Sequence, residues 1–229
     1  YFSYHYTTNN KNIMKTEFEK YATGHLNIPS LNLHDYKNSM TPYILEEREM
    51  RATQMDIFSR LMMDRILWCA GPINDRMSTI VQAQLMFLNS VEKKDITIHI
   101  DSPGGSVKSG LSIVDVRDYT DCDIRTINTG MAASMGSILL GAGTKGKRSS
   151  LRFSKTMLHQ SSGGMGGNIQ DARISMDEWE KTNKILFDLL GKFTSKTAKK
   201  VMKDATRDLW LDANEALKYG IIDEIIGKK

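Results

Sequence analysis

Three short stretches determine how this chain is interpreted: Asp101-Ser-Pro-Gly-Gly-Ser106, Gly130-Met-Ala-Ala-Ser-Met-Gly136 and Met157-Leu-His-Gln160. The middle stretch places a serine among small residues, where a strand is predicted to turn into a helix. The third carries a histidine on an apolar strand. The first supplies two adjacent glycines, whose backbone N–H groups a ligand can approach closely. An acyl-transfer enzyme needs a nucleophile, a base and an oxyanion hole, and these stretches offer all three.

The composition is that of one globular domain. Of 229 residues, 40% are hydrophobic and 25% charged, which provides for a sizeable core. The net charge of +4 comes without a basic stripe, so nucleic acid is not an expected partner. No apolar run approaches the roughly 20 residues of a membrane span, so no membrane partner is expected. Cys69 and Cys122 are predicted to be buried free thiols, and no signal peptide is visible, which together predict a cytoplasmic protein.

Residues 1–42 are polar and interrupted by Asn, Ser and Pro, which predicts a flexible N-terminal arm ahead of a folded domain over 43–229. In residues 95–101 isoleucines alternate with polar residues, the pattern of a strand with one buried face. Predicted strands and helices alternate along this domain, which indicates βαβ units, a parallel sheet and an α/β fold. The strands are predicted at 66–70, 95–101, 123–128, 147–153 and 156–161. The helices are predicted at 56–62, 75–90, 107–119, 134–142, about 168–193, 195–204 and 214–219.

Ser134 and His159 are the candidate nucleophile and base. A serine before a helix is usually only a cap, but small neighbours here leave room for a substrate, and helix N–H groups favour a developing negative charge. A histidine on an apolar strand is more often a core residue, yet imidazole is well suited to accept a serine proton. We expect the Ser134 Oγ to lie within about 4 Å of the His159 Nε2. The carboxylate that orients the imidazole stays open between four residues: Asp204, Asp208, Asp212 and Asp223.

The loop Asp101–Ser106 has two interpretations. Pro-Gly favours a simple tight turn. Alternatively, a glycine N–H and the N–H of Met135 form an oxyanion hole. Phosphate binding is less favoured because the loop lacks the spaced glycines and lysine of a P-loop. A metal is not expected, since no His, Cys or carboxylate pair shows ligand spacing.

Taken together, these motifs resemble the ClpP family, the proteolytic subunits of ATP-dependent Clp proteases. The resemblance covers roughly residues 41–226 and extends, in the family's order, to Phe58–Leu61, Ala142–Arg148 and Tyr219–Glu224. It implies a ClpP/crotonase-like α/β core with a protruding helical handle, for which the helix at 168–193 is the candidate. It also implies a homo-oligomer of two stacked seven-membered rings that enclose a chamber.

The resemblance assigns roles to individual residues. It selects Asp208 as the third member of a catalytic triad with Ser134 and His159. It implies an oxyanion hole from the amides of Gly105 and Met135. The implied substrate groove comprises Gly104, Ser161, Ser162, Gly163 and Gly164. The implied activity is that of a serine endopeptidase that cleaves unfolded polypeptides, without a cofactor in this chain because ATP is used by a partner Clp-type AAA+ ATPase.

Two departures from the family pattern lie near the histidine. The chain has Ser161-Ser162 after His-Gln, where the family usually has Pro-Leu, which changes the segment that pairs with extended substrates. Leu151-Arg152-Phe153 replaces the usual Leu-Pro-Asn and alters the approach to the histidine strand.

Further departures concern assembly. Thr206 stands where the family commonly has an aspartate that, with Arg207, couples the two rings. Thr97 and His99 stand where the family tends to place tyrosines that receive hydrophobic loops of the ATPase. The acidic positions early in the handle are also altered, with Arg173 on that face. These changes predict weaker ring coupling and a weaker or different ATPase docking.

Two other function classes stay open from the sequence. One is a weakly active or non-catalytic scaffolding subunit of a mixed Clp ring, which the altered docking positions favour. The other is a crotonase-type acyl-CoA enzyme, which shares the fold and the paired amides but needs no Ser-His-Asp set. Reaction of Ser134 with a fluorophosphonate would distinguish the peptidase from both.

Overall fold

The computed structural model describes residues 43–48, 51–164 and 168–227. The chain divides into two units, Tyr1–Ile57 and Phe58–Lys229. In the first unit, β1 (Tyr43–Arg48) and β2 (Arg51–Asp56) form an antiparallel hairpin. The flexible arm predicted over 1–42 lies outside the described residues.

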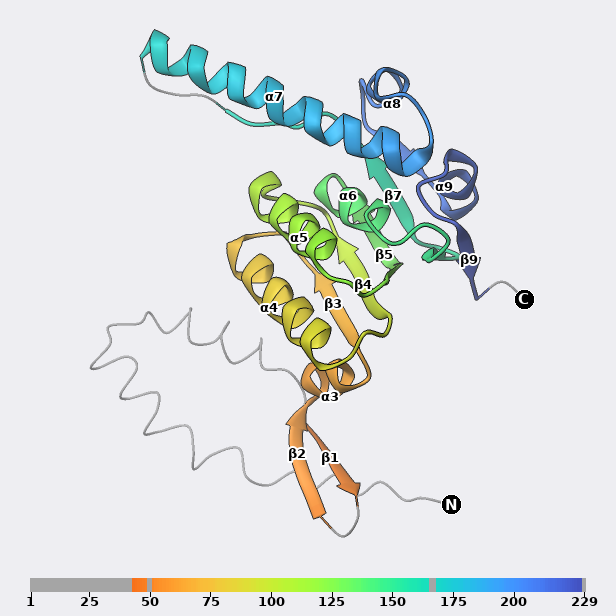
Figure 1. Ribbon diagram of the computed structural model, residues 1–229. Helices are drawn as coiled ribbons and strands as arrows, with labels where there is room; N and C mark the ends of the chain where they lie inside the picture. Colours follow the sequence, from red (N-terminus) through yellow and green to blue (C-terminus); the bar gives the residue numbers. More distant parts are fainter. Residues whose placement is uncertain (1–42, 49–50, 165–167, 228–229) are drawn as a thin grey trace, which may run out of the picture. The chain divides into compact units, whose positions relative to one another are not determined.

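The second unit is built on a seven-stranded sheet (Figure 1). Five strands form its main path, in the order β3 (Ile66–Ala70), β4 (Ile96–Ser102), β5 (Ile124–Ala133), β6 (Arg148–Leu151) and β9 (Glu224–Ile226), all paired in parallel. β7 (Lys155–Leu158) branches from β5 in parallel and pairs on its other side with β8 (Leu209–Leu211), which is antiparallel to it. The sheet confirms the predicted α/β class.

Helices join the first parallel strands, as the βαβ pattern predicted. After the short α3 (Ile57–Met63), they are α4 (Asp75–Val91), α5 (Val107–Tyr119) and α6 (Met135–Gly141). α4 starts where the Asn74 side chain accepts from the Met77 N–H at 2.9 Å, and it buries Val81 and Leu85 on its inner face. Every residue of α6 is buried, as expected for a helix that is apolar or small all round.

The predicted strand bounds needed correction at several points. The alternation of 95–101 is confirmed, because Ile96, Ile98 and Ile100 are buried. β5, however, runs five residues beyond the predicted end at Asn128, because it continues to pair in parallel with β7 up to Ala133. The strands predicted at 147–153 and 156–161 are present, but the observed strands, β6 and β7, are shorter than predicted. β8 and β9 are too short for a period-two pattern and were not predicted.

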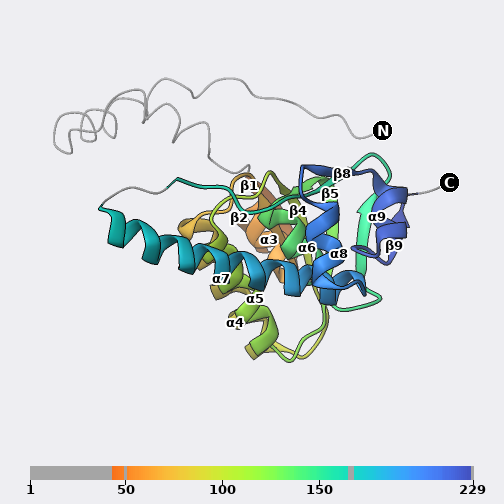
Figure 2. The ribbon, with the colours of Figure 1, turned by 90° about the horizontal axis from the view of Figure 1, so that it is seen from above.

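The C-terminal third is helical, with α7 (Ile169–Thr194), α8 (Ala198–Asp204) and α9 (Ala213–Tyr219). α7 buries residues only between Leu186 and Thr194, and its first half extends past the sheet (Figure 2). This is the helix that the resemblance assigned to the handle. α8 begins at Ala198 rather than 195, because Ser195 adopts a left-handed conformation (φ 56°) that ends α7. α9 begins with a capping box, in which the Asp212 side chain accepts from the Glu215 N–H.

A buried cation joins three of these elements. Arg148 is 1% exposed, and its Nε and Nη2 donate to the two carboxylate oxygens of Asp223 at 2.8 and 2.6 Å. Its Nη1 donates to the Phe193 carbonyl at 2.8 Å and its Nη2 to the Gly220 carbonyl at 3.1 Å. Burial raises the pKa of Asp223, but hydrogen bonds from Arg148 and from the Gly146 N–H lower it, to about 2. The pair therefore ties β6 to the ends of α7 and α9.

Within the described part of the chain, no helix is both long enough and apolar enough to cross a membrane.

Candidate active site

The candidate residues gather where three neighbouring strands end. β4 leads into Gly104 and Gly105, β5 leads into Ser134, and β7 leads into His159. Because β5 pairs in parallel with both β4 and β7, the carboxyl ends of these strands lie at one edge of the sheet. That edge is the usual place for a site in an open α/β sheet.

Ser134 occupies the sharp turn between β5 and α6. Its φ of 53° and ψ of −121° are unusual for a residue with a side chain, and such strain concentrates at functional sites. Its N–H donates to the Met157 carbonyl at 2.9 Å, which joins the turn to β7. Its side chain makes no capping hydrogen bond, although it precedes the first residue of α6. The hydroxyl is therefore available for a role other than capping.

The hydroxyl of Ser134 instead meets His159. The Ser134 Oγ lies 2.8 Å from the His159 Nε2, which confirms the expected separation of less than about 4 Å. On the other side of the ring, the His159 Nδ1 lies 3.5 Å from Asp208 Oδ1. The structure thus places one serine, one histidine and one aspartate in line, in the arrangement of an activated nucleophile.

The pairing of β7 with β8 explains why Asp208 is the carboxylate at this site. The strands are antiparallel, and their register ends with Leu158 opposite Leu209. The next residue on one strand is His159, and the preceding residue on the other is Asp208. The pairing therefore brings two residues that are far apart in sequence to the same level of the sheet.

The other candidate aspartates have different partners. Asp204 forms an ion pair with Lys200 one turn earlier on α8. Asp212 caps α9, and Asp223 binds the buried Arg148. Each of these carboxylates stabilises local structure, which leaves Asp208 as the one beside the imidazole.

The glycine loop lies directly against the serine turn. A Cβ added to Gly104 would come within 2.7 Å of both the Ser134 Cβ and the Ala133 carbonyl oxygen, and its φ of 94° also favours glycine. Gly105 packs equally closely against Ile73, and its N–H donates to no acceptor among the described residues. The N–H of Met135, the first residue of α6, has no partner within its own helix. The role of the Gly105 and Met135 amides as oxyanion-hole donors stays a prediction.

A small cavity of about 20 Å³ lies beside the nucleophile. Its walls come from the start of α5, from α6 and from the buried part of α7. Its lining residues are Val107, Ser134, Met135, Ser137, Ile138, His159, Ser161, Leu186, Phe187 and Leu190. The buried side chains of α7 thus form one wall of the space next to the reacting groups.

The predicted groove residues have partners that sequence reasoning missed. The Ser161 N–H and Oγ both contact Asn183 Oδ1, at 3.2 and 3.1 Å, and the indole N–H of Trp179 donates to the Ser161 Oγ at 2.6 Å. Gly163 lies against the Trp179 ring, where an added Cβ would be 3.3 Å from it. Ser162 is exposed, and Gly164 has open space where a Cβ would be added. The one signal in the sequence was a tryptophan in an otherwise polar part of the long helix.

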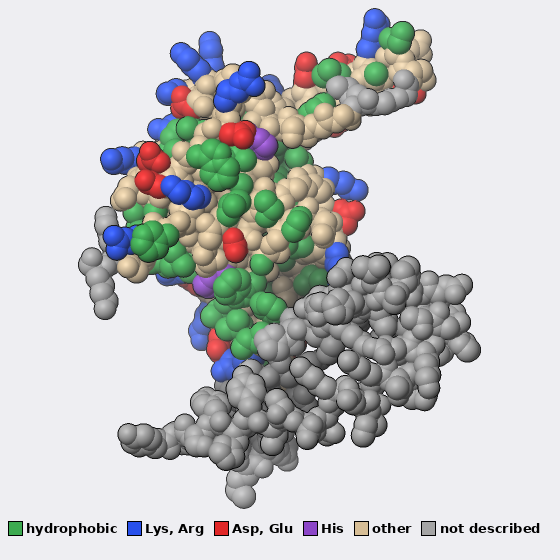
Figure 3. Space-filling view, turned by 180° about the vertical axis from the view of Figure 1, so that it is seen from behind, with side chains coloured by type: hydrophobic (Ala, Val, Ile, Leu, Met, Phe, Trp, Pro, Cys, Tyr) green, Lys and Arg blue, Asp and Glu red, His purple; other side chains and the backbone are tan. Residues whose placement is uncertain are grey.

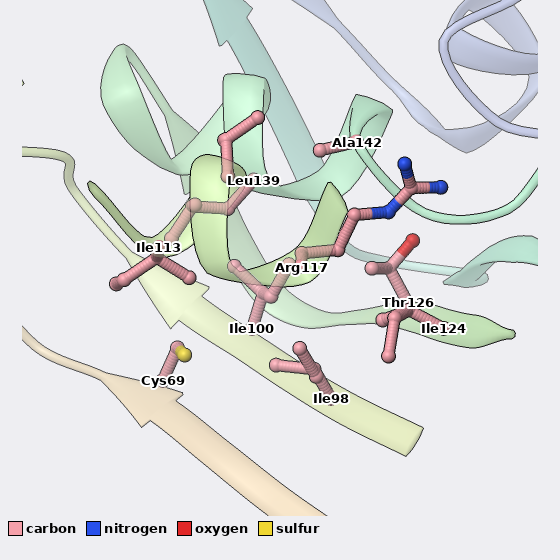
Figure 4. A pocket seen from close by; sticks show the side chains of 10 residues that line it. Cys69, Ile98, Ile100, Ile113, Arg117, Ile124, Thr126, Leu139 and Ala142 are labelled. Atoms are coloured by element: carbon pink, nitrogen blue, oxygen red, sulfur yellow. The ribbon is translucent and has the colours of Figure 1, made fainter. Parts of the chain in front are cut away.

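The cysteines offer no second nucleophile. Burial raises the pKa of the Cys69 thiol to about 12, so the thiol stays protonated. The Cys69 side chain lines a cavity of about 10 Å³. Figure 4 shows it together with Ile98, Ile100 and Ile113, which line the same cavity. Cys69 and Cys122 are both free and buried, as predicted. Within the described residues, no group of three or more His, Cys, Asp or Glu side chains is placed to hold a metal ion.

The residues that depart from the family pattern have local partners. His99 stacks on Trp68 with ring centroids 4.7 Å apart, and burial lowers the pKa of its imidazole. The Thr206 hydroxyl donates back to the Lys203 carbonyl at 2.9 Å. Arg207 is exposed and makes no hydrogen bond or ion pair with the part of the chain that the structure describes. The guanidinium of Arg152 lies over the Phe153 ring at 5.1 Å from its centroid.

The parallel sheet and the Ser-His-Asp arrangement define an α/β protein with the site of a hydrolase. Residues 47–229 match the family model described as Clp protease, and the chain belongs to this family. It is 46% identical over 217 residues to an ATP-dependent Clp protease proteolytic subunit of Porphyromonas gingivalis, a match that covers 93% of this chain and 98% of that protein. It is 47% identical over 218 residues to a protein of the same name from Bacteroides fragilis (93% and 99%). For a Streptococcus mutans protein of that name, identity is 45% over 190 residues (82% and 97%).

Proposed function

We propose that this protein is a serine endopeptidase, the proteolytic subunit of an ATP-dependent Clp protease, and that it cleaves unfolded polypeptides. The observation that carries the proposal is the 2.8 Å contact between the Ser134 Oγ and the His159 Nε2, at a serine whose strained turn exposes it to the site. Membership of the Clp protease family and the names of the relatives support the same conclusion.

The reaction follows from the positions of these groups. The Ser134 Oγ attacks the peptide carbonyl carbon while its proton passes to the His159 Nε2, and Asp208 orients the ring through Nδ1. The carbonyl oxygen becomes an oxyanion that accepts from the amides of Gly105 and Met135. Imidazolium then returns the proton to the leaving amine, which leaves an acyl-enzyme. A water molecule repeats the sequence with His159 as base, and the ester bond to Ser134 breaks.

The cavity beside Ser134 supports a preference for apolar side chains on the acyl side of the cleaved bond. Its walls include Ile138, Leu186 and Leu190, and burying a methylene there favours binding by about 0.8 kcal/mol. Phe187 also lines this cavity and limits its size. Unfolded polypeptides expose such side chains, whereas folded proteins bury most of them.

A partner ATPase would supply unfolded substrate, and no cofactor is proposed for this chain. The relatives are named as subunits of an ATP-dependent protease, which supports a Clp-type AAA+ ATPase as the partner. The stack of Trp68 on His99 occupies the strand face where such docking is expected, so the docking should differ in detail. Two buried free thiols support a cytoplasmic location.

A double seven-membered ring is the proposed assembly. Large apolar side chains are exposed on the second unit, and Figure 3 shows several of them on one face. On α4 alone, Ile80, Met86, Phe87 and Val91 are 47%, 52%, 55% and 62% exposed. Contiguous exposed apolar surface favours contact between subunits.

We expect the two rings to dissociate more readily than is usual for the family. The Thr206 hydroxyl donates to the Lys203 carbonyl in the last turn of α8, and Thr206 supplies no carboxylate for the exposed Arg207. The Thr206→Asp variant should shift the population toward the double ring, most clearly at low salt, because added salt screens such a pair. Sedimentation velocity of wild type and variant across a salt series measures this. A wild type that stays a double ring at micromolar concentration and high salt, with no effect of Thr206→Asp, would contradict it.

Fluorophosphonate labelling tests the proposed function most directly. The reagent reacts with an activated serine, so wild type should be labelled at one residue and Ser134→Ala should not. Peptide mapping of the labelled protein should identify Ser134. An unlabelled wild type would instead favour the scaffolding subunit of a mixed ring.

A further inference from the structure

The segment that follows the candidate base has a free backbone edge. Residues 160–164 belong to no strand, and among them only Ser161 has a backbone group hydrogen-bonded to a described residue. The N–H and C=O groups of Ser162, Gly163 and Gly164 therefore have no hydrogen-bond partner among the described residues. An extended peptide can add to such an edge as a further strand, and main-chain hydrogen bonds then supply much of the affinity.

A backbone segment that contains two adjacent glycines is not rigid by itself. Gly163 and Gly164 have large conformational freedom, and ordering them costs conformational entropy. A peptide that had to order this segment on binding would bind less tightly. Contacts that order the segment before binding would therefore raise the affinity for the peptide.

Contacts that can order the segment come from α7. Trp179 and Asn183 are one turn apart on this helix, and both bond to the Ser161 side chain. The hydroxyl accepts from the indole and donates to the amide oxygen, while the same oxygen also accepts from the Ser161 N–H. The Trp179 ring also lies against Gly163, where an added Cβ would be 3.3 Å from it.

The position of these contacts on α7 is informative. Trp179 and Asn183 are half-buried, ahead of the fully buried stretch that starts at Leu186. They lie where the helix leaves the body, and a pocket of about 210 Å³ opens there against Gln160 and Ser161. A proline in place of Ser161 would have neither the N–H nor the hydroxyl, so these bonds depend on the serine that distinguishes this chain from the family pattern.

We propose that Trp179 and Asn183 are positioning residues. They hold segment 161–163 in an ordered conformation before binding, so that its backbone can pair with an extended peptide substrate. The proposal rests on the proposed peptidase function for the nature of the ligand. It assigns these two residues an effect on substrate binding rather than on the Ser134–His159 pair, because His159 is already held by the pairing of β7 with β5 and β8.

The test is equilibrium binding of a fluorescent, extended apolar peptide to the Ser134→Ala protein, followed by anisotropy. Adding Trp179→Phe, which removes both the indole N–H and the ring atoms that lie against Gly163, should raise the dissociation constant about five- to tenfold, as should Asn183→Leu. The matched control is Lys184→Leu, an exposed neighbour on α7 without a described partner, which should leave binding unchanged. Ser161→Ala and Trp179→Phe both remove the bond between the indole N–H and the Ser161 Oγ, so their combination should cost less than the sum of the two single effects.

Kinetics on the protein with Ser134 intact give the second readout. The Trp179→Phe variant should show a raised KM for the extended peptide, with kcat and the rate of fluorophosphonate labelling within about twofold of wild type. Unchanged peptide affinity in both variants would overturn the proposal. So would an equal loss of labelling rate and kcat, which would indicate a disturbed active site. Because the binding arm needs no catalysis, absence of labelling in wild type would count against the proposed function alone.

Discussion

Replacing Ser134 or His159 by alanine should reduce the rate of peptide hydrolysis by a factor on the order of 10⁴ or more. Each change removes one end of the 2.8 Å contact through which the serine proton must leave. The measurement is kcat/KM for short fluorogenic peptides, with the assembly state of every variant checked beforehand. Asp208→Asn should cause a loss of similar order, because an amide no longer favours the imidazole tautomer that accepts the serine proton.

The losses should not add, because the three side chains act as a unit. The Ser134→Ala/His159→Ala protein should be about as slow as Ser134→Ala alone. Matched controls are Ser112→Ala, whose hydroxyl bonds within α5, and His99→Ala, whose ring stacks on Trp68. Both should retain their activity on short peptides. Equal rates in wild type, Ser134→Ala and His159→Ala would contradict the assignment.

The largest effect on stability should come from Asp223→Asn. The variant leaves the guanidinium of Arg148, 1% exposed, without its counter-charge, and breaking a buried ion pair from one side typically costs about 3–5 kcal/mol. Urea unfolding at a fixed subunit concentration measures the change. The control is Asp121→Asn, which removes the exposed partner of Lys93 and should change stability little. A similar small change in Asp223→Asn would show that the buried pair contributes no net stability.

The same pair predicts a dependence on pH. The pKa of Asp223 is about 2 in the folded protein and about 4 when unfolded, so its contribution is fully present above pH 4 and is lost as the pH falls toward 2. Wild type should therefore lose more stability than Asp223→Asn between about pH 4 and pH 2. Parallel stability curves for the two proteins over that range would contradict the prediction.

Local sequence patterns predicted the parts of the fold in which neighbours along the chain decide the structure. The alternation at Ile96, Ile98 and Ile100 identified a half-buried strand, and the helix predicted at 75–90 corresponds to α4. The end of β5 was missed because its last residues form a strand only through pairing with β7, which lies more than 20 residues further on. Pairing of this kind leaves no period in the sequence of one strand.

Ser134 and His159 could be identified from the sequence, because a serine among small residues before a helix and a histidine after an apolar strand are local features. The choice of Asp208 over three other aspartates could not be made from residue type and spacing, and before the structure it depended on the family resemblance. The tertiary structure places Asp208 there through the register of β7 on β8, and a shift of one residue would turn the carboxylate to the other face. The contacts of Trp179 and Asn183 with Ser161 likewise needed the fold, because they join a helix to a loop that only packing brings together.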